Sequence, residues 1–395
     1  MMSVTLPVAY VPLVDAAPLI VAREMGFASA EGIDLDLIAA PSWSSVRDML
    51  AFGRVDAAQL LSPVPVAMSL GLGGVAQPVS AVSVLSVNGN VIGVSCALEA
   101  RMRAAGYTFD FSDARAAATA LAKAADGPLT FGVPFPFSMH MELLSYWLEH
   151  TDLRDVNVEL RTVPPPLMAQ ALAAGDVDAF CVGEPWGSAA VEQKAGALLL
   201  PGKAIWAFAP EKVLAVRTEW AETEPHLLGK LMRAVWRAGR WLNDPQHRTS
   251  AAELLSHKTY LDLPSEIIDR ALTGRLTISP HGEQREVPGF LEFHQGAANF
   301  PWRSQAKWIA HRLAERNALQ DAQSRETAGT VFRTDIYRSQ MDSTGADLPG
   351  ASEKVEGAIL AETAVASEKG RLLLQPDAFF DGAVFDPDAA ELHRK

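Results

Sequence analysis

The chain has 395 residues, 49% of them hydrophobic and 21% charged, and its formal net charge is −13. This length and apolar fraction suffice for a large core divided between two lobes. No apolar run reaches the roughly 18–20 residues of a membrane span, so we expect no membrane association. Lys and Arg do not cluster, which argues against direct nucleic-acid binding because phosphate contacts need grouped cations.

The first elements predicted are a strand at 4–10, a loop that holds Pro12 and Asp15, and an apolar helix at 16–25. A secretory signal would place basic residues before an unbroken apolar run. In this chain the first basic residue is Arg23, and prolines interrupt the apolar residues. We therefore expect a cytoplasmic protein.

Strands and helices then alternate in two stretches of the same order. The first stretch continues with a strand at 33–39, a helix at 43–52 and a strand at 55–61. The second has a strand at 129–133, a helix at 139–149, a strand at 156–163, a helix at 167–174 and a strand at 177–182. The segments MLAFGRVDAAQL (49–60) and ALAAGDVDAFCV (171–182) occupy equivalent places and share their V-D-A strand entry. Such alternation predicts parallel βαβ units, and two sets of them predict an α/β protein of two lobes.

Four loops are candidates for binding a ligand, because ligands of such lobes lie where the parallel strands end and helices begin. The loops lie at 12–15, 41–43, 134–140 and 164–167. Ser42 and Ser138 are typical N-caps, which places Trp43 and His140 in the first turns of their helices. Backbone N–H groups and the helix dipole favour an anion at such points.

The two cysteines and nine histidines do not suggest a metal site. Cys96 and Cys181 lie in apolar, strand-like contexts, so we expect two buried thiols rather than a disulfide or zinc framework. No two histidines show the H-x-x-x-H or H-E-x-x-H spacing of a helical metal site. We expect no metal and no cofactor.

Several motifs in a fixed order resemble the nitrate-binding-protein family of solute receptors. They include PSWSSVRDML, VNGNVIG, PFPFSMHMELL, PPPLMAQALAAGDVDAFCVGEPW, IWAFAPEKVLAV, FPWRSQAKW and QPDAFFDGAVFDPDA. That family contains the substrate-binding subunits of nitrate/nitrite and bicarbonate ABC transporters, and a cytoplasmic nitrate/nitrite sensor of assimilation operons. The resemblance covers nearly the whole chain.

The resemblance implies a type II periplasmic-binding-protein-like fold with a ligand cleft between two lobes. Residues 1–90 and 213–310 would form the first lobe, 91–212 the second, and 311–395 a C-terminal segment that wraps both. Because no leader is visible, the cytoplasmic sensor is the favoured function. Such a sensor binds nitrate or nitrite and controls release of a response-regulator-type RNA-binding antiterminator. The alternative is the substrate-binding subunit of a nitrate/nitrite or bicarbonate ABC transporter whose leader has been removed.

The resemblance also implies a set of ligand-binding residues: Trp43, Asn90, His140, Pro165, Gly183 and Lys212. Without it, Lys212 would be a strand-entry lysine with its ammonium in water, and Glu211 would orient that lysine or face solvent. With it, Lys212 becomes the charge partner of the anion. Asn88 and Asn90 both offer amide donors, and the sequence leaves open which of them faces the cleft.

An enzyme is the least favoured interpretation. A few two-lobed relatives of such receptors act on thiamine precursors. No cysteine or histidine of this chain stands beside a paired base in the manner of an activated nucleophile. We therefore expect no catalytic residues.

Overall fold

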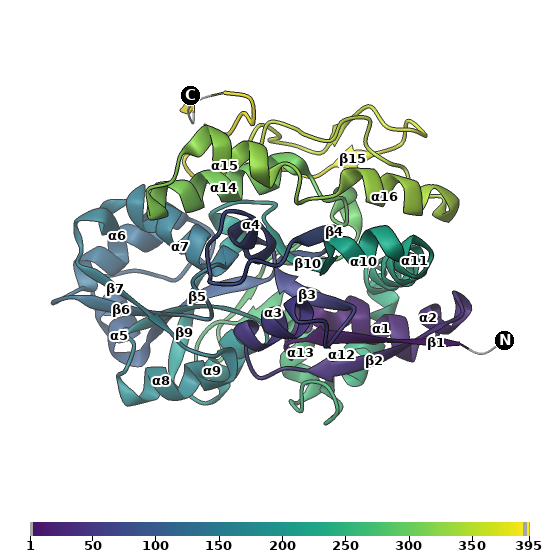
Figure 1. Cartoon of the computed structure of the whole chain (residues 1–395). Helices are drawn as coiled ribbons and strands as arrows, with labels where there is room; N and C mark the ends of the chain where they lie inside the picture. The colour runs from purple at the N-terminus through teal and green to yellow at the C-terminus, as the bar shows by residue number, and fades with distance from the viewer. Residues whose placement is uncertain (1–2, 390–392, 395) are drawn as a thin grey trace.

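In this computed structural model, which describes residues 3–389, 393 and 394, two mixed β-sheets lie side by side with helices around them (Figure 1). The first sheet has the order β13 (Leu291–Glu292), β4 (Val79–Asn88), β10 (Pro210–Arg217), β3 (Ala57–Leu61), β1 (Val4–Tyr10) and β2 (Ile33–Ala39). Strand β1 pairs in parallel with β2 and β3, whereas β10 runs antiparallel to β3 and β4. The predicted parallel unit is thus confirmed, with antiparallel strands added at its edge.

The second sheet repeats this arrangement. Its order is β7 (Val158–Thr162), β6 (Leu129–Val133), β8 (Ala179–Gly183), β5 (Asn90–Ser95) and β9 (Gly196–Pro201). Strand β6 is parallel to β7 and β8, and β5 is antiparallel to β8 and β9. The two α/β lobes predicted from the repeated order of elements are therefore present.

The helices that begin at the ends of parallel strands were also predicted. They are α1 (Ala17–Glu24), α3 (Trp43–Ala51), α7 (Met139–Glu149) and α8 (Met168–Ala174). The Oγ atoms of Ser42 and Ser138 accept N–H groups of the first turns of α3 and α7, as expected of N-caps. Each V-D-A alanine is the first residue of its strand, β3 or β8, and the valine and aspartate precede it, so both strands begin two residues later than predicted.

The chain passes between the lobes at two places close in space. Strand β4 ends at Asn88, and β5 begins two residues later at Asn90. Gly89 makes the turn at a φ of +92°, and a Cβ there would lie 2.8 Å from Leu291 Cδ1, so glycine is required. The return passes from β9 to β10, and Lys212 consequently lies on a strand of the first sheet. The domain ranges given above remain a proposal, but at their boundaries Asn90 lies in the second sheet and residues 210–212 lie in the first.

The remaining helices of the lobes cover the sheets. They are α2 (Phe27–Ala30), α4 (Pro63–Ser69), α5 (Cys96–Ala104), α6 (Ala114–Ala124), α9 (Trp186–Glu192), α10 (Thr218–Thr223), α11 (Pro225–Leu242), α12 (Arg248–Ser256), α13 (Ser265–Thr273) and α14 (Arg303–Asn317). Two short strands, β11 (Arg275–Thr277) and β12 (Gln284–Glu286), form a separate hairpin. Helix α11 is amphipathic, and its apolar side chains are buried.

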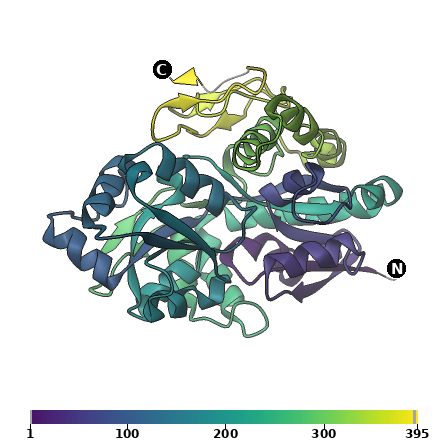
Figure 2. The same ribbon diagram turned by 60° about the vertical axis from the view of Figure 1, so that its left-hand side comes forward.

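The C-terminal segment lies across the top of both lobes (Figures 1 and 2). It contains α15 (Asp321–Ala328), α16 (Thr334–Met341), β14 (Thr363–Ala364), β15 (Leu373–Leu374), β16 (Ala383–Val384) and β17 (His393–Arg394). Tyr146 of α7 donates its hydroxyl to Asp381 of the segment. The segment therefore fastens to the second lobe as well as to the first.

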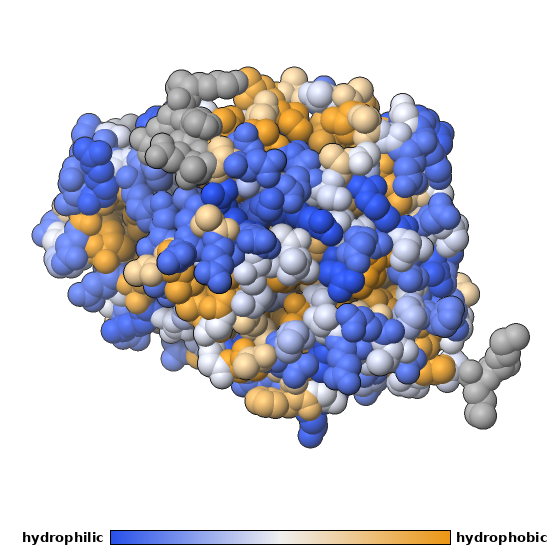
Figure 3. Space-filling model, turned by 45° about the horizontal axis from the view of Figure 1, so that its top comes forward, coloured by the Kyte–Doolittle hydropathy of each residue, from blue (hydrophilic) through white to orange (hydrophobic). Residues whose placement is uncertain are grey.

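Polar residues cover much of one face of the molecule. Figure 3 shows this face, on which hydrophilic residues predominate and apolar ones gather near the upper edge and in smaller groups elsewhere. Phe52 and Leu360, each 75% exposed, are the most exposed large apolar side chains among those described. In the described part of the chain no helix is both long and apolar enough to span a bilayer. Cys181 is buried as expected, but Cys96 is exposed because it opens helix α5 rather than lying in a strand.

Candidate functional site

A buried lysine lies where the two lobes meet. Lys212 follows the first two residues of β10, and its Nζ lies 2.7 Å from Asp15 Oδ2 and 2.7 Å from Glu211 Oε1. The same Nζ lies 5.2 Å from the centre of the Trp43 ring. None of the lysine side chain is exposed, which is rare for lysine unless it is paired.

The first lobe fixes the carboxylate of Asp15 from behind. Asp15 lies in a short 3₁₀ turn, Val14–Ala16, between β1 and α1. Gln59 of β3 donates its amide N–H to Asp15 Oδ1 at 2.6 Å, and its own oxygen accepts the N–H of Val11 at 3.1 Å. Gln59, the polar residue of the otherwise apolar strand AAQLL, thus has a hydrogen-bond partner for both its N–H and its oxygen.

The second lobe contributes three residues at the ends of its own elements. Asn90, which opens β5, donates its amide N–H to Glu211 Oε2 at 2.6 Å. His140, in the first turn of α7, has its Nδ1 3.5 Å from Glu211 Oε1. Gly183 ends β8, and a Cβ there would lie 2.8 Å from Leu13 Cδ2 and 3.5 Å from His140 Nε2. Only glycine allows this strand end to approach the first lobe so closely.

We call these eight residues the interlobe cluster: Asp15, Trp43, Gln59, Asn90, His140, Gly183, Glu211 and Lys212. Two contacts between lobes lie beside it. The N–H of Val14 donates to the Glu184 carbonyl at 3.0 Å, and Trp186 Nε1 donates to the Pro12 carbonyl at 3.1 Å. The lobes are closed on the cluster, and its titratable members are at most 4% exposed.

Burial dominates the electrostatics of the cluster. It raises the pKa of Asp15 and of Glu211, and the ammonium of Lys212 offsets only part of this effect. Burial alone would lower the pKa of Lys212, but the two carboxylates outweigh it and raise that pKa. Burial, reinforced by Lys212, lowers the pKa of His140 well below its ordinary range. The imidazole is therefore neutral, and the cluster holds one fixed cation between two carboxyl groups whose pKa is raised by burial.

Four polar atoms of the cluster have no hydrogen-bond partner although they are buried. They are Trp43 Nε1, Asn90 Oδ1 and both ring nitrogens of His140. An unsatisfied buried donor or acceptor costs about 1–3 kcal/mol. Four such atoms at the meeting point of two lobes are typical of a site that contacts a small polar ligand.

Five of the six residues assigned to the ligand meet in this cluster: Trp43, Asn90, His140, Gly183 and Lys212. Pro165 is buried in a 3₁₀ turn at Pro165–Leu167, and among the residues described no hydrogen bond links it to the cluster. Asn88 does not face the cleft, because its amide donates to the Ala207 carbonyl and its oxygen accepts the Ala209 N–H. The structure thus selects Asn90 over Asn88.

Three residues of the cluster were missed or left undecided from the sequence. Asp15 lies in a loop identified as a candidate, and it is the only charged residue in the run VPLVDAAPLIV, which was a usable signal. Gln59 stands out only as a polar residue in a buried strand. Glu211 does not face solvent but bonds Lys212 directly. The sequence suggested that Lys212 is a free positive charge. In the structure it is not free, because two carboxylates already surround it.

A metal centre has no structural support among the residues described. There, no three His, Cys, Asp or Glu side chains come together as a metal ion would require.

Comparison with known proteins places the chain in a family. The NMT1-like family matches residues 2–256. The nitrate import ATP-binding protein NrtC of Synechocystis sp. is 35% identical over 318 residues, which are 79% of this chain and 46% of that protein. The nitrate/nitrite binding protein NrtA of Nostoc sp. is 28% identical over 97% of this chain and 83% of its own length. This chain thus spans about half the length of NrtC but most of NrtA.

A solved structure establishes the fold. The periplasmic nitrate-binding protein NrtA from Synechocystis PCC 6803 superimposes with a TM-score of 0.83 and 24% identity, over 98% of this chain and 96% of that one. The two-lobed, periplasmic-binding-protein-like α/β fold expected from the sequence is confirmed. The resemblance to nitrate-binding receptors of ABC transporters is confirmed as well.

Proposed function

Because this chain belongs to the NMT1-like family, we propose that it is a receptor that encloses nitrate or nitrite between its lobes, as the substrate-binding subunit of an ABC importer. The relatives named above are import and binding proteins for these anions, and they support an import role more than the sensor role predicted from the sequence. The nitrate/nitrite binding protein NrtA is named for binding, and we propose for this chain binding without catalysis.

One observation carries this proposal. Two lobes converge on a buried cluster in which four polar atoms lack partners, and two of these are nitrogens of His140. Nitrate is a small planar anion whose oxygens accept hydrogen bonds in one plane. Trp43 Nε1–H and one N–H of the neutral His140 are donors of the kind it needs. Lys212 supplies the positive charge, provided that a neighbouring carboxyl group takes up a proton.

The same charges argue for a monoanion. A dianion such as sulfate would bring two negative charges to a dry cluster that already contains two carboxyl groups, which is costly. We therefore expect nitrate and nitrite to bind more tightly than sulfate. Competition calorimetry tests this order, and tighter binding of sulfate than of nitrate would contradict it.

The sensor interpretation differs in partner rather than in ligand. A cytoplasmic receptor would signal through the surfaces that change when its lobes open and close, and the anion would shift that balance only by its different affinity for the two forms. A pull-down of a response-regulator-type antiterminator, retained without nitrate and released by millimolar nitrate, would favour the sensor. Capture of an importer's membrane subunits by the nitrate-bound form would favour transport.

Calorimetric titration with nitrate tests the site itself. His140→Ala removes both unpartnered ring nitrogens and should weaken nitrate binding about tenfold, as expected for the loss of a hydrogen bond to a charged ligand. His226→Ala is the matched control, because His226 is exposed at the start of α11. If His140→Ala and the wild type bind nitrate with equal affinity, the interlobe cluster is not the binding site.

A further inference from the structure

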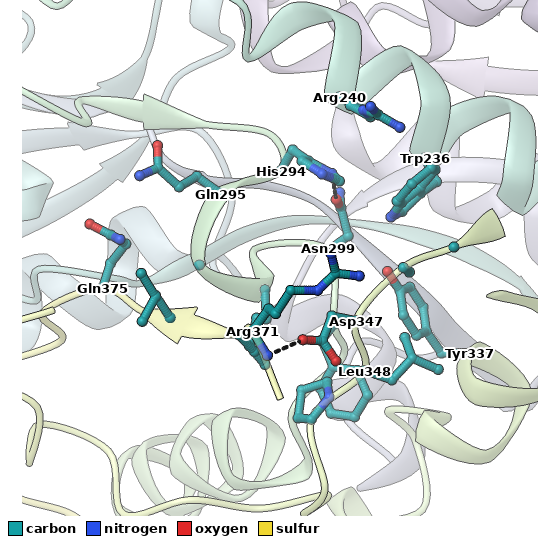
Figure 4. A pocket seen from close by; sticks show the side chains of 18 of the residues that line it. Trp236, Arg240, His294, Gln295, Asn299, Tyr337, Asp347, Leu348, Arg371 and Gln375 are labelled. Carbon is teal, nitrogen blue, oxygen red and sulfur yellow. Dashed lines mark hydrogen bonds between the residues drawn. The ribbon is translucent and has the colours of Figure 1, made fainter. Parts of the chain in front are cut away.

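A cavity whose lining includes no residue of the interlobe cluster lies between the first lobe and the C-terminal segment (Figure 4). Its volume is about 460 Å³, within the range of small-molecule sites. Helix α11 provides Trp236 and Arg240 for one wall, and residues 294–300 continue it. The other wall comes from α16 and from residues 345–349 and 371–375.

Hydrogen-bond donors converge on this cavity. Figure 4 shows the guanidinium group of Arg371, the hydroxyl of Tyr337 and the indole nitrogen of Trp236 turned toward the same space. Trp236 and Tyr337 are 8% and 4% exposed, yet neither polar atom has a hydrogen-bond partner in the part of the chain that the structure describes. Among the same residues, Arg240 and Arg371 form no side-chain hydrogen bond and no ion pair.

The carboxylates of the cavity are already engaged. Asp347 accepts the backbone N–H groups of Lys369 at 2.7 Å and Arg371 at 2.8 Å, and the Ser367 hydroxyl at 2.9 Å. Glu362 accepts the amide of Gln375 at 2.9 Å. The carboxylates therefore hold the segment together, and the guanidinium group of Arg371 acts on Asp347 only through space, without a direct contact. This asymmetry favours a ligand that supplies negatively charged acceptors.

Two of the donors, on Trp236 and Tyr337, are held in place by packing. The Trp236 ring meets His294 edge to face at 5.1 Å, and His294 Nδ1 lies 3.1 Å from Asn299 Oδ1. The Tyr337 ring packs edge to face on Phe300 at 5.5 Å. At the far side a Cβ on Gly296 would lie 2.7 Å from Gln375 Cγ, so the two walls meet there without room to spare. Such fixed side chains lower the entropic cost of binding.

We propose that this cavity is a second ligand site, for a small organic carboxylate with an apolar body, distinct from the site between the lobes. The carboxylate contacts Arg371, Tyr337 and Trp236. The apolar body packs on Phe300, Leu348 and Leu372, which also line the cavity. An inorganic anion alone would leave this apolar wall uncovered.

Calorimetry with benzoate and 3-phenylpropionate as probes, and benzamide as the uncharged counterpart of benzoate, tests the site. We expect one of the acids to bind with 1:1 stoichiometry and the amide not to bind. Arg371→Gln should weaken the acid about tenfold or more, and Tyr337→Phe should weaken it less. Arg154→Gln is the matched control, since Arg154 is 70% exposed and lies on the second lobe.

The same preparations are titrated with nitrate. Nitrate affinity should be unchanged in Arg371→Gln, and saturating nitrate should not displace the acid. Failure of both acids to bind at millimolar concentration would overturn the proposal. So would equal binding to Arg371→Gln and wild type, or displacement by nitrate, which would place the acid between the lobes.

Discussion

Two lysines of this protein, one fully buried and the other 12% exposed, are each held by two carboxylates, but only the first group lies between the lobes. The cleft triad consists of Lys212, Asp15 and Glu211, and the tail triad consists of Lys354, Glu356 and Asp377. In the tail triad, Ser304 donates to Glu356 at 2.6 Å, and the Ile359 N–H donates to Asp377 at 2.8 Å. All of these partners belong to α14 or to the segment packed on it.

The carboxylates of the cleft triad accept hydrogen bonds as those of the tail triad do, but the donors come from both lobes. Gln59 of the first lobe bonds Asp15, whereas Asn90 of the second lobe bonds Glu211. His140, with two unpartnered nitrogens, lies against the same carboxylate. A lysine with two carboxylates thus fastens the C-terminal segment in the tail triad, whose partners lie on α14 and that segment. In the cleft triad, whose partners come from both lobes, the same arrangement forms a candidate ligand site. The predictions below test this distinction.

The largest effect should come from removing the lysine of each triad. Removing one partner of a buried ion pair costs about 3–5 kcal/mol of stability, so Lys212→Ala and Lys354→Ala should both lower the urea midpoint strongly. Lys212→Ala should also weaken nitrate binding about 30-fold or more, whereas Lys354→Ala should bind nitrate as wild type does. The loss of stability is expected because removal of the lysine leaves two buried carboxylates without their cation.

Matched variants separate binding from folding in this experiment. Lys123→Ala changes an exposed lysine of α6 and should alter neither property. Lys212→Arg keeps the charge and should recover stability better than nitrate affinity, because the guanidinium group is larger than the ammonium. Weakened nitrate binding in folded Lys354→Ala would contradict the assignment of the tail triad to structure alone.

A pH effect on stability should arise at the contact between lobes. Burial raises the pKa of Glu184 to about 7 from its ordinary 4.5, with Arg270 as the opposing charge. Because the folded chain holds this proton more tightly, protonation stabilises the fold. The gain is complete below about pH 4.5 and is lost as the pH rises through 7. At about 1.4 kcal/mol per pKa unit it is on the order of 3 kcal/mol.

Glu184→Gln should remove this dependence. Urea denaturation from about pH 5 to pH 8 should show the wild type losing stability relative to Glu184→Gln as the pH rises. Glu159→Gln, which changes an exposed residue of β7, should follow the wild type. Parallel curves for wild type and Glu184→Gln would show that Glu184 is ionised throughout.

A smaller effect concerns the cleft triad and the anion. Its formal charges are +1, −1 and −1, so a bound monoanion adds a third negative charge to a dry site. The raised pKa of Asp15 and of Glu211 lets a proton enter with the anion. Nitrate affinity should therefore fall as the pH rises, by up to about tenfold per pH unit for one proton. Calorimetry in buffers of different ionisation enthalpy counts that proton, and an affinity independent of pH would exclude the uptake.

Much of the fold followed from local pattern. The alternation of apolar runs, the serine N-caps and the glycine that ends α8 are local signals, and strands β1, β2 and β6 begin and end where predicted. Strand β10 was harder to place in a sheet, because its antiparallel pairing with β4 joins residues more than a hundred positions apart. The local pattern of apolar residues in β10 does not indicate that β4 is its neighbour in the sheet.

The candidate site was less predictable for the same reason. Trp43 and His140 follow visible N-caps, so their positions at helix starts could be read. Asp15 could not be paired with Lys212, because their contact depends on the order of β1, β3 and β10 in one sheet. The sequence therefore presented Lys212 as a free charge, and the neutralising carboxylates emerged only from the assembled sheet.

The smallest effect should distinguish the aromatic neighbours of the two lysines. Trp43 lies 5.2 Å from Lys212 Nζ, and Trp302 lies 5.9 Å from Lys354 Nζ. A desolvated cation–π contact is worth up to about 2 kcal/mol and is weaker with phenylalanine. Trp43→Phe also removes the unpartnered Nε1–H, so nitrate affinity should fall a few-fold while the fold remains. Trp302→Phe should leave nitrate affinity unchanged in the same calorimetric titration. Equal losses in both variants would mean that nitrate binding depends on ring size through general packing. The position of Trp43 between the lobes would then not be the cause.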